Sequence, residues 1–208
     1  MSRSNRIIIS ISSDIGYDLA KKWLLDGHNV YGTYRTNSKK LLELKKLGAK
    51  VFKCDLLKEV SIKTFLKNIK KIKWDVLVLS AGTQEPIGSF NKINFLEWEK
   101  SILVNFINQL KIMHGLIPQK RDSKIKPIVI FFAGGGTNNA TLNYSAYTIS
   151  KIASIKMCEL LDAEINNIRF TILGPGWVKT KIHKQTLKAK IQSGKNYYRT
   201  LNNFKNEV

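Results

Sequence analysis

The chain has 208 residues, enough for one well-packed domain, and 43% of them are hydrophobic, which is typical of a folded globular protein. The formal net charge of +20 comes almost entirely from lysine, 29 Lys against 6 Arg, spread along every segment. Because surfaces that read bases or clamp phosphates favour clustered arginines, this pattern argues against a nucleic-acid partner and indicates solvated helix faces. Binding of polyanions in general stays open as a lesser alternative.

The apolar runs and the reactive side chains exclude further classes of protein. The run IVIFFA at 128–133 is of strand length, well short of the ~20 residues that span a membrane. The basic start MSRSNRIIIS is followed by too few apolar residues for a secretory signal, so we expect a cytoplasmic protein without a membrane partner. Cys54, Cys158 and three scattered histidines match no disulfide framework or metal-ligand spacing, so no metal site is expected.

Short β-branched runs alternate with amphipathic stretches along the whole chain. We expect strands at 6–11, 29–34, 49–54, 75–80, 127–132 and 169–173. We expect helices at 15–27, 37–48, 61–72, 95–117 and 145–165. Strict β–α alternation with continuously apolar strands predicts a parallel sheet covered on both faces. The predicted fold class is therefore α/β: a single-domain, Rossmann-type, doubly wound parallel sheet in three α/β/α layers.

The turn after the first predicted strand is a degraded form of the glycine-rich turn that binds dinucleotides. In doubly wound sheets the ligand lies at the carboxyl ends of the strands, so the residues that follow each strand matter most. The turn SISSDIG keeps only the last expected glycine, Gly16, and has Ser10 and Asp14 in place of the first two. We expect Asp14 to cap the helix that begins at Ile15. A plain strand–turn–helix explains this stretch equally well.

The other strand ends carry further candidate ligand contacts. Arg35 follows the second strand, where an acidic residue favours NAD and an arginine favours NADP, so the pattern favours NADP over NAD. Asp55 follows the third strand as a candidate adenine contact or a turn residue. Ala81 and Gly82 follow the fourth strand and permit close approach of a ligand, and the loop GPGWVKT after the sixth strand ends in Thr180.

Tyr147 and Lys151 stand four residues apart, on one face of the helix that follows the fifth strand. Seven tyrosines and a lysine fraction of 29 in 208 give about one such pair by chance, and Tyr17 with Lys21 is a second instance. Position in the fold, rather than spacing, therefore singles out the later pair. A free phenol has a pKa of about 10. A neighbouring ammonium would lower that value and let Tyr147 act as a general acid or base.

Six motifs in this order, SISSDIG, CDLL, LSAG, VNF, YTISK and PGWVKT, resemble the short-chain dehydrogenase/reductase family across residues 6 to 182. The resemblance implies that Tyr147 is the general acid/base, that Lys151 assists it and holds the nicotinamide ribose, and that Asn105 completes a proton relay. It also implies a set of cofactor contacts. These are Ser10, Ser12, Ser13, Ile15, Arg35, Asp55, Leu56, Ser80, Ala81, Gly82, Tyr147, Lys151, Pro175, Gly176, Val178 and Thr180.

The chain departs from the family pattern at two places. The family's carbonyl-orienting serine falls on Gly134, and Thr137 is the nearest upstream hydroxyl that could replace it, with Ser145 less well placed. The 28 residues after Thr180 contain no apolar strand, whereas the family usually continues to a seventh strand that helps to pair subunits. We therefore divide the chain into a dinucleotide-binding and catalytic domain, 1–182, and a short tail or lid of the same domain, 183–208. A homodimer stays open.

These features together predict an NADP(H)-dependent oxidoreductase that interconverts a carbonyl and a secondary alcohol. We expect the substrate to be a small molecule, and the lysine-rich surface suggests an anionic or sugar-like one. The missing serine and the degraded glycines motivate a rival interpretation, a non-catalytic Rossmann module that binds a nucleotide or a regulatory partner. A basic polyanion-binding protein is the third alternative.

Overall fold

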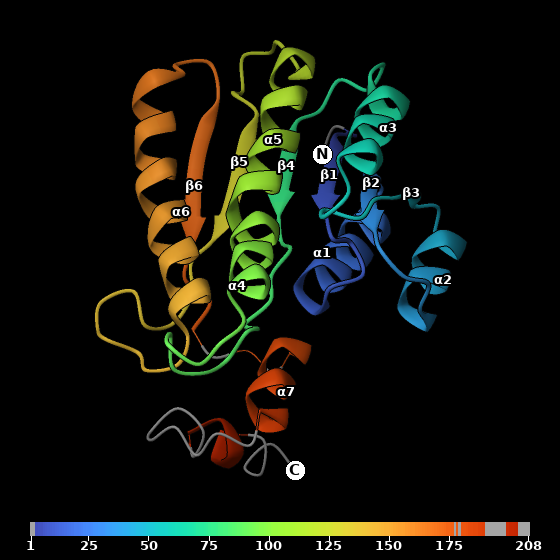
Figure 1. Cartoon of the computed structure of the whole chain (residues 1–208). Helices are drawn as coiled ribbons and strands as arrows, with labels where there is room; N and C mark the ends of the chain where they lie inside the picture. Colours follow the sequence, from blue (N-terminus) through green and yellow to red (C-terminus); the bar gives the residue numbers. More distant parts are fainter. Residues whose placement is uncertain (1–2, 177, 179, 190–198, 204–208) are drawn as a thin grey trace.

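A computed structural model describes residues 3–176, 178, 180–189 and 199–203, and its centre is one parallel sheet of six strands (Figure 1). The strands are β1 (Asn5–Ile9), β2 (Asn29–Tyr34), β3 (Lys50–Lys53), β4 (Val76–Leu79), β5 (Ile128–Phe132) and β6 (Arg169–Leu173). Their order across the sheet is β3-β2-β1-β4-β5-β6, and every neighbouring pair is parallel. The predicted doubly wound Rossmann-type fold is confirmed.

Helices cover both faces of this sheet. They are α1 (Asp14–Leu25), α2 (Lys39–Lys46), α3 (Glu59–Ile69), α4 (Phe95–Ile102), α5 (Asn108–Leu116), α6 (Ser145–Glu164) and α7 (Lys181–Lys188). Side chains alternate across the sheet, so Ile7 and Ile9 point into one layer of the core and Ile8 into the other. The first layer packs against α3, α5 and α6, and the second against α1 and α2.

All six predicted strands are present. The 29–34 and 169–173 predictions coincide with β2 and β6, and the other four differ from the observed strands by one or two residues at their ends. The helix expected at 95–117 is interrupted. It runs as α4, then a π-helical segment η1 (Leu103–Ile107), then α5, and ends in a 3₁₀ turn η2 (Ile117–Gln119). The expected cap at Asp14 is wrong, because Ser13 is the N-cap and its hydroxyl accepts the Gly16 N–H.

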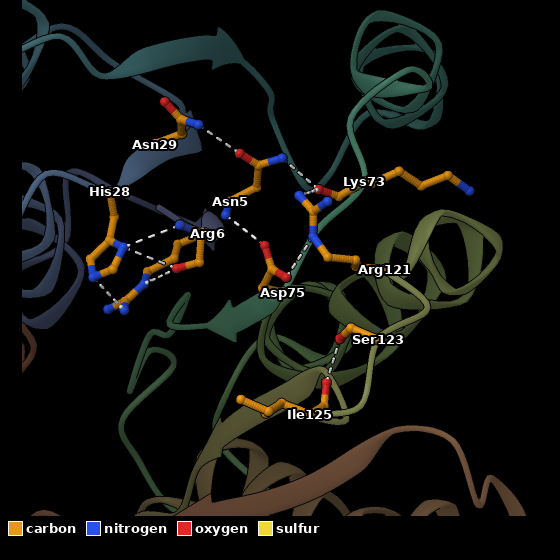
Figure 2. A network of polar contacts seen from close by, with 10 residues as sticks. Asn5, Arg6, His28, Asn29, Lys73, Asp75, Arg121, Ser123 and Ile125 are labelled. Atoms are coloured by element: carbon orange, nitrogen blue, oxygen red, sulfur yellow. Dashed lines mark hydrogen bonds and ion pairs between the residues drawn. The ribbon is translucent and has the colours of Figure 1, made fainter. Parts of the chain in front are cut away.

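A polar network fastens the amino ends of β1, β2 and β4 to the loop before β5 (Figure 2). The Asp75 carboxylate accepts the Asn5 N–H at 2.7 Å and the Arg121 Nε–H at 2.7 Å. On the other side of β1, the Arg6 guanidinium donates to His28 Nε2 at 2.8 Å and lies over the Trp23 ring. These hydrogen bonds stabilise the amino edge of the sheet.

The helix α7 lies beyond the carboxyl ends of the strands (Figure 1). The division expected between residues 182 and 183 falls inside this helix. Most of the expected tail, 190–198 and 204–208, lies outside the described residues. No helix in the described part of the chain is long and apolar enough to cross a membrane.

Candidate functional site

The strand order reverses between β1 and β4, and the turn after β1 lies at this point. Ser10 takes a left-handed φ of 69°, the backbone conformation for which glycine is usually required. Gly16 packs so closely that a Cβ there would lie 2.6 Å from the Ser10 carbonyl oxygen. The turn therefore keeps the tight strand–helix packing of a dinucleotide site although two of its glycines are replaced.

Hydroxyl groups tie this turn to the end of β4. The Ser80 Oγ donates to the Ile9 carbonyl at 2.7 Å, and the Ser13 Oγ lies 3.4 Å from the Ser80 Oγ. Ser12 lies in the same turn and Ile15 in the first turn of α1, both half-buried. Ala81 and Gly82 follow Ser80, as expected. The structure thus brings the ends of the first and fourth strands side by side.

Asp14 lies in the first turn of α1, where the positive end of the helix would face a pyrophosphate. Its Oδ1 accepts from the Lys40 Nζ at 2.7 Å, and its Oδ2 accepts from the Lys181 backbone N–H at 2.6 Å. Burial works against the charge of this carboxyl, but the two hydrogen bonds outweigh it and hold its pKa below the ordinary value. An anion of the protein itself therefore occupies the positive end of α1.

The residues at the ends of β2 and β3 differ in whether the protein itself already binds them. Arg35 follows β2 directly and is exposed. Asp55 behaves as a turn residue, because its Oδ1 accepts the Leu57 N–H at 3.0 Å, and the Leu56 carbonyl accepts from Asn108. Arg35 therefore remains accessible to a ligand, whereas Asp55 already has a structural partner.

Tyr147 and Lys151 lie on α6 at the end of β5. The Lys151 side chain is 6% exposed, and its Nζ donates to the Phe132 carbonyl at 2.9 Å and lies 5.7 Å from the centroid of the Tyr147 ring. Burial lowers the pKa of Lys151 to about 8. Burial also raises the pKa of Tyr147, contrary to the lowering expected from a neighbouring ammonium. At neutral pH the phenol is therefore protonated in this arrangement.

Gly134 lies directly against the Tyr147 phenol. A Cβ at this glycine would lie 2.5 Å from the Tyr147 Oη, closer than any side chain tolerates. Thr137, the expected substitute for the family's serine, lies half-buried in the following turn and makes no side-chain hydrogen bond to any described residue. The tyrosine thus fills the space in which a serine side chain would begin.

Asn105 is 2% exposed and lies in the π-helical segment η1. Its Oδ1 accepts the Thr83 N–H at 2.8 Å, and its Nδ2 donates to the Thr83 carbonyl at 2.9 Å. Ser101, one turn earlier, accepts a second hydrogen bond from the same amide. Asn105 therefore fixes the loop after β4 through its side chain.

The helix α7 is fastened across this loop. The Gln185 Oε1 accepts the Gln84 N–H at 2.8 Å, and the Thr186 hydroxyl joins Gln84 to Tyr144. Ile182 approaches to 3.6 Å of a Cβ placed on Gly82. Sequence reasoning missed Gln185 and Thr186, because only the three-dimensional fold brings residues a hundred positions apart into contact.

The loop after β6 leads into α7. Pro175, Gly176, Val178 and Thr180 are all described, and Gly176 has a left-handed φ of 71°. Thr180 is the N-cap residue of α7 but makes no side-chain cap. These residues connect the carboxyl end of β6 to α7.

The residues present fit a dinucleotide in outline. The close packing at Gly16, the small side chains after β4 and the accessible Arg35 suit the adenosine and phosphate groups. Tyr147 and Lys151 lie on α6, which follows β5. Asp14 is the one discordant group, and its charge is compensated by Lys40. No cluster of metal-binding side chains occurs among the residues that the structure describes.

The sheet order and its parallel strands are those of a Rossmann-type domain. Residues 5–191 match the family model described as short chain dehydrogenase, so the chain belongs to the short-chain dehydrogenase/reductase family, whose members bind NAD(P).

Individual relatives agree with this membership. The chain is 29% identical over 189 residues to the short-chain dehydrogenase/reductase olcF of Penicillium canescens, a match that covers 85% of this chain and 69% of that protein. The crystal structure of the short-chain dehydrogenase/reductase YIR035C of Saccharomyces cerevisiae is similar with a TM-score of 0.83 at 22% identity, covering 98% of this chain and 83% of that one. For the KRED1-Pglu enzyme the TM-score is 0.84 at 20% identity, with 98% and 87% covered. These two structures support the fold.

Proposed function

We propose that the protein is an NADP(H)-dependent oxidoreductase that interconverts a carbonyl and a secondary alcohol on a small molecule. The observation that carries the proposal is the position of the half-buried Tyr147 beside the buried Lys151, at the carboxyl edge of the sheet next to the loop after β5. Membership of the family supports the reaction class, and the neighbouring positions of Tyr147 and Lys151 support the roles proposed for them.

The cofactor would be held at the carboxyl ends of the strands. The turn at Ser10, Ser12 and Ser13, the first turn of α1 at Ile15, and the segment from Ser80 to Gly82 would receive the phosphates and riboses. Arg35 would bind a 2′-phosphate, which supports NADP over NAD. Pro175, Gly176, Val178 and Thr180 would contact the nicotinamide end.

When bound, the nicotinamide group supplies or accepts the hydride. The protein's own part is proton transfer and orientation. Burial keeps the Tyr147 phenol protonated, which is the form that donates a proton to a carbonyl oxygen. Lys151, whose pKa of about 8 leaves it mostly charged at pH 7, would stabilise the phenolate that remains.

Consumption of NADPH with a panel of anionic, sugar-type and apolar carbonyl compounds tests the proposal. Tyr147→Phe should abolish turnover and leave the dissociation constant of NADPH nearly unchanged, because the phenyl ring keeps its packing. Unchanged turnover in this variant would exclude Tyr147 as the acid. Failure of both NADPH and NADH to bind at millimolar concentration would favour the non-catalytic module.

We also propose that the protein forms a homodimer through η1 and α6. Leu103 and Ile107 on η1, and Ile149, Ile152 and Leu160 on α6, are between 36% and 48% exposed. Ile149 and Leu160 lie on one stripe of α6, and α6 packs against η1. Sedimentation of the protein and of Ile149→Lys distinguishes a dimer from a monomer.

A further inference from the structure

The positive charge of the chain is not distributed evenly over the fold. The helix α1 contains two acidic and two basic residues, and α6 contains three acidic and two basic residues. Segment 60–73, which runs from the second residue of α3 into the loop before β4, contains five lysines and no acidic residue. All five are exposed, and we call them the α3 basic face: Lys63, Lys67, Lys70, Lys71 and Lys73.

The lysines of α3 form a row along one side of the helix. Lys63, Lys67 and Lys70 are spaced by four and then three residues, so their Cα atoms lie on one face, about 6 and 4.5 Å apart along the helix axis. The apolar side of the same helix carries Ile62 and Phe65, which are at most 1% exposed and pack in the core. Burial of that side fixes the rotation of α3 and keeps the row of lysines in solvent.

The loop before β4 extends this row to the amino edge of the sheet. Lys73 lies beside the network around Asp75, where its backbone carbonyl accepts from Asn5 at 2.6 Å. Its side chain extends away from that network (Figure 2). The α3 basic face therefore continues from the helix to the amino edge, whereas Tyr147 and Lys151 lie at the carboxyl edge.

The acidic side chains near this face are already bound by other cations. Lys63 lies 3.7 Å from Glu59, whose second oxygen is bonded to Lys111 at 2.6 Å. The other four lysines of the face make no ion pair with any residue that the structure describes. The neighbouring carboxylates and their partners are Glu59 with Lys111, Asp75 with Arg121, and Asp122 with Lys120.

The surroundings of these lysines indicate which anionic partner fits them. The core of a protein–protein interface is apolar and aromatic, but none of the exposed large hydrophobic side chains falls within residues 61–73. A helix that binds in a membrane surface exposes its apolar side, but that side of α3 is buried. A row of ammonium groups without apolar neighbours instead matches a row of phosphates, as in the backbone of a nucleic acid.

We propose that the α3 basic face binds the phosphodiester backbone of nucleic acid without reading its sequence. Lysine ammonium groups act as point charges toward phosphates, and the face contains no arginine to form paired hydrogen bonds with base edges. Such binding is driven by release of counterions, so it weakens steeply as salt is added. The inference does not rest on the proposed reaction, because the face and the Tyr147–Lys151 pair lie on different elements.

Fluorescence anisotropy tests the proposal with two labelled probes, a 20-base-pair DNA duplex and a 20-nucleotide RNA strand, each in two unrelated sequences. We expect dissociation constants in the micromolar range at low salt, equal for the two sequences of each probe. The logarithm of the binding constant should fall with the logarithm of salt concentration, by roughly 0.9 per contacted phosphate for the duplex and roughly 0.7 for the single strand. The tighter probe identifies the form of nucleic acid that the face prefers.

The triple variant Lys67→Gln/Lys70→Gln/Lys71→Gln removes three charges from the face. Its binding should weaken alike for every sequence, and its salt slope should become shallower by about 3. The matched control, Lys22→Gln/Lys46→Gln/Lys156→Gln, removes the same charge from exposed positions on α1, α2 and α6 and should keep the wild-type slope. Arginine at the same three positions of α3 keeps the charge and should bind as the wild type does.

Four results would overturn the inference. These are no binding of either probe at low salt, equal loss of binding in the triple variant and its control, a strong preference for one sequence, and displacement of the probe by saturating NADPH. The last result would place the nucleic acid near Arg35 at the carboxyl ends of the strands. Binding to vesicles of phosphatidylserine and phosphatidylcholine, with no binding of either nucleic acid, would also contradict it and favour a membrane surface.

Discussion

The hydroxyl of Tyr147 lies 2.5 Å from the point that a Cβ on Gly134 would occupy. The observed position of the tyrosine therefore requires that residue 134 has no side chain. Glycine at this position thus does more than remove the hydroxyl of a serine. The resemblance to the family places a serine at this position. The position of the Tyr147 phenol and the glycine at 134 therefore depend on each other.

Gly134→Ser should accordingly not improve the enzyme. The new side chain must push the phenol aside, which we expect to cost about 1–3 kcal/mol of unfolding free energy. Because the displaced phenol becomes less buried, its raised pKa should fall, as measured by ultraviolet titration. Gly134→Ala is the control that adds bulk without a hydroxyl. Higher turnover in the serine variant than in the alanine variant would contradict this prediction. It would show that Tyr147 can move to make room and that the serine hydroxyl contributes to catalysis.

Asp14→Asn should strengthen binding of NADPH under the proposed function, because it removes a negative charge from the first turn of α1, where the pyrophosphate would lie, while keeping the shape of the side chain. One unfavourable charge contact near the surface corresponds to an increase of about tenfold in affinity. Asp18→Asn, on the exposed face of the same helix, changes the net charge equally and is the control. Equal effects of the two variants on the dissociation constant would reduce the role of Asp14 to net charge.

Arg35→Ala should raise the dissociation constant of NADPH by one to two orders of magnitude, and that of NADH much less, because an arginine–phosphate contact is lost only with the former. Fluorescence titration with both cofactors measures the difference. Lys71→Ala, an exposed cation at the amino edge, controls for charge alone. Parallel changes for NADPH and NADH would contradict the assignment of NADP.

The fold could be predicted from the sequence because its strands are continuous apolar runs separated by amphipathic helices. That pattern specifies a parallel sheet without any tertiary information. The break at Leu103 could not be predicted in this way. The apolar pattern of residues 95–117 predicts one continuous helix, and the hydrogen bonds from the Gln109 amide to the carbonyls of Val104 and Asn105 become visible only in three dimensions.

The candidate site was predicted where motif order places it, and missed where the contacts are long-range. Tyr147, Lys151 and Asn105 lie near one strand edge because each follows or faces a strand end. Asp14 looked like a helix cap because acidic residues are common at that position. Its partners, Lys40 and the backbone of Lys181, come from distant segments that no local pattern connects to it.

Lys151→Met should stabilise the protein at pH 7 while abolishing turnover. The folded state lowers the pKa of this lysine from 10.5 to about 8, so between these values the unfolded chain binds the extra proton. Stability therefore rises with pH across this window, and below pH 8 the buried charge carries its full cost, on the order of 3 kcal/mol. Urea unfolding at pH 7 and pH 10 measures the effect. The gain from Lys151→Met should shrink at the higher pH, and a loss of stability at pH 7 would contradict it.

His28 should make the protein sensitive to mild acid. This side chain is 7% exposed, and its Nε2 accepts from the Arg6 guanidinium (Figure 2). Burial lowers its pKa, the charge of Arg6 lowers it further, and Asp26 and Asp75 only partly oppose them. As the pH falls below the ordinary histidine pKa of 6.5, His28 therefore binds a proton in the unfolded chain before it does so in the folded chain. The free energy of unfolding decreases as the pH drops.

His28→Gln keeps a side chain that can accept from Arg6 but cannot titrate. Its unfolding free energy should therefore change less between pH 7.5 and pH 5.5 than that of the wild type, as measured by urea denaturation at both values. His114→Gln is the matched control, because His114 is exposed on α5 and loses no buried contact. The argument fails for His28 if the wild type and His28→Gln lose the same stability on acidification, since another group would then take up the proton.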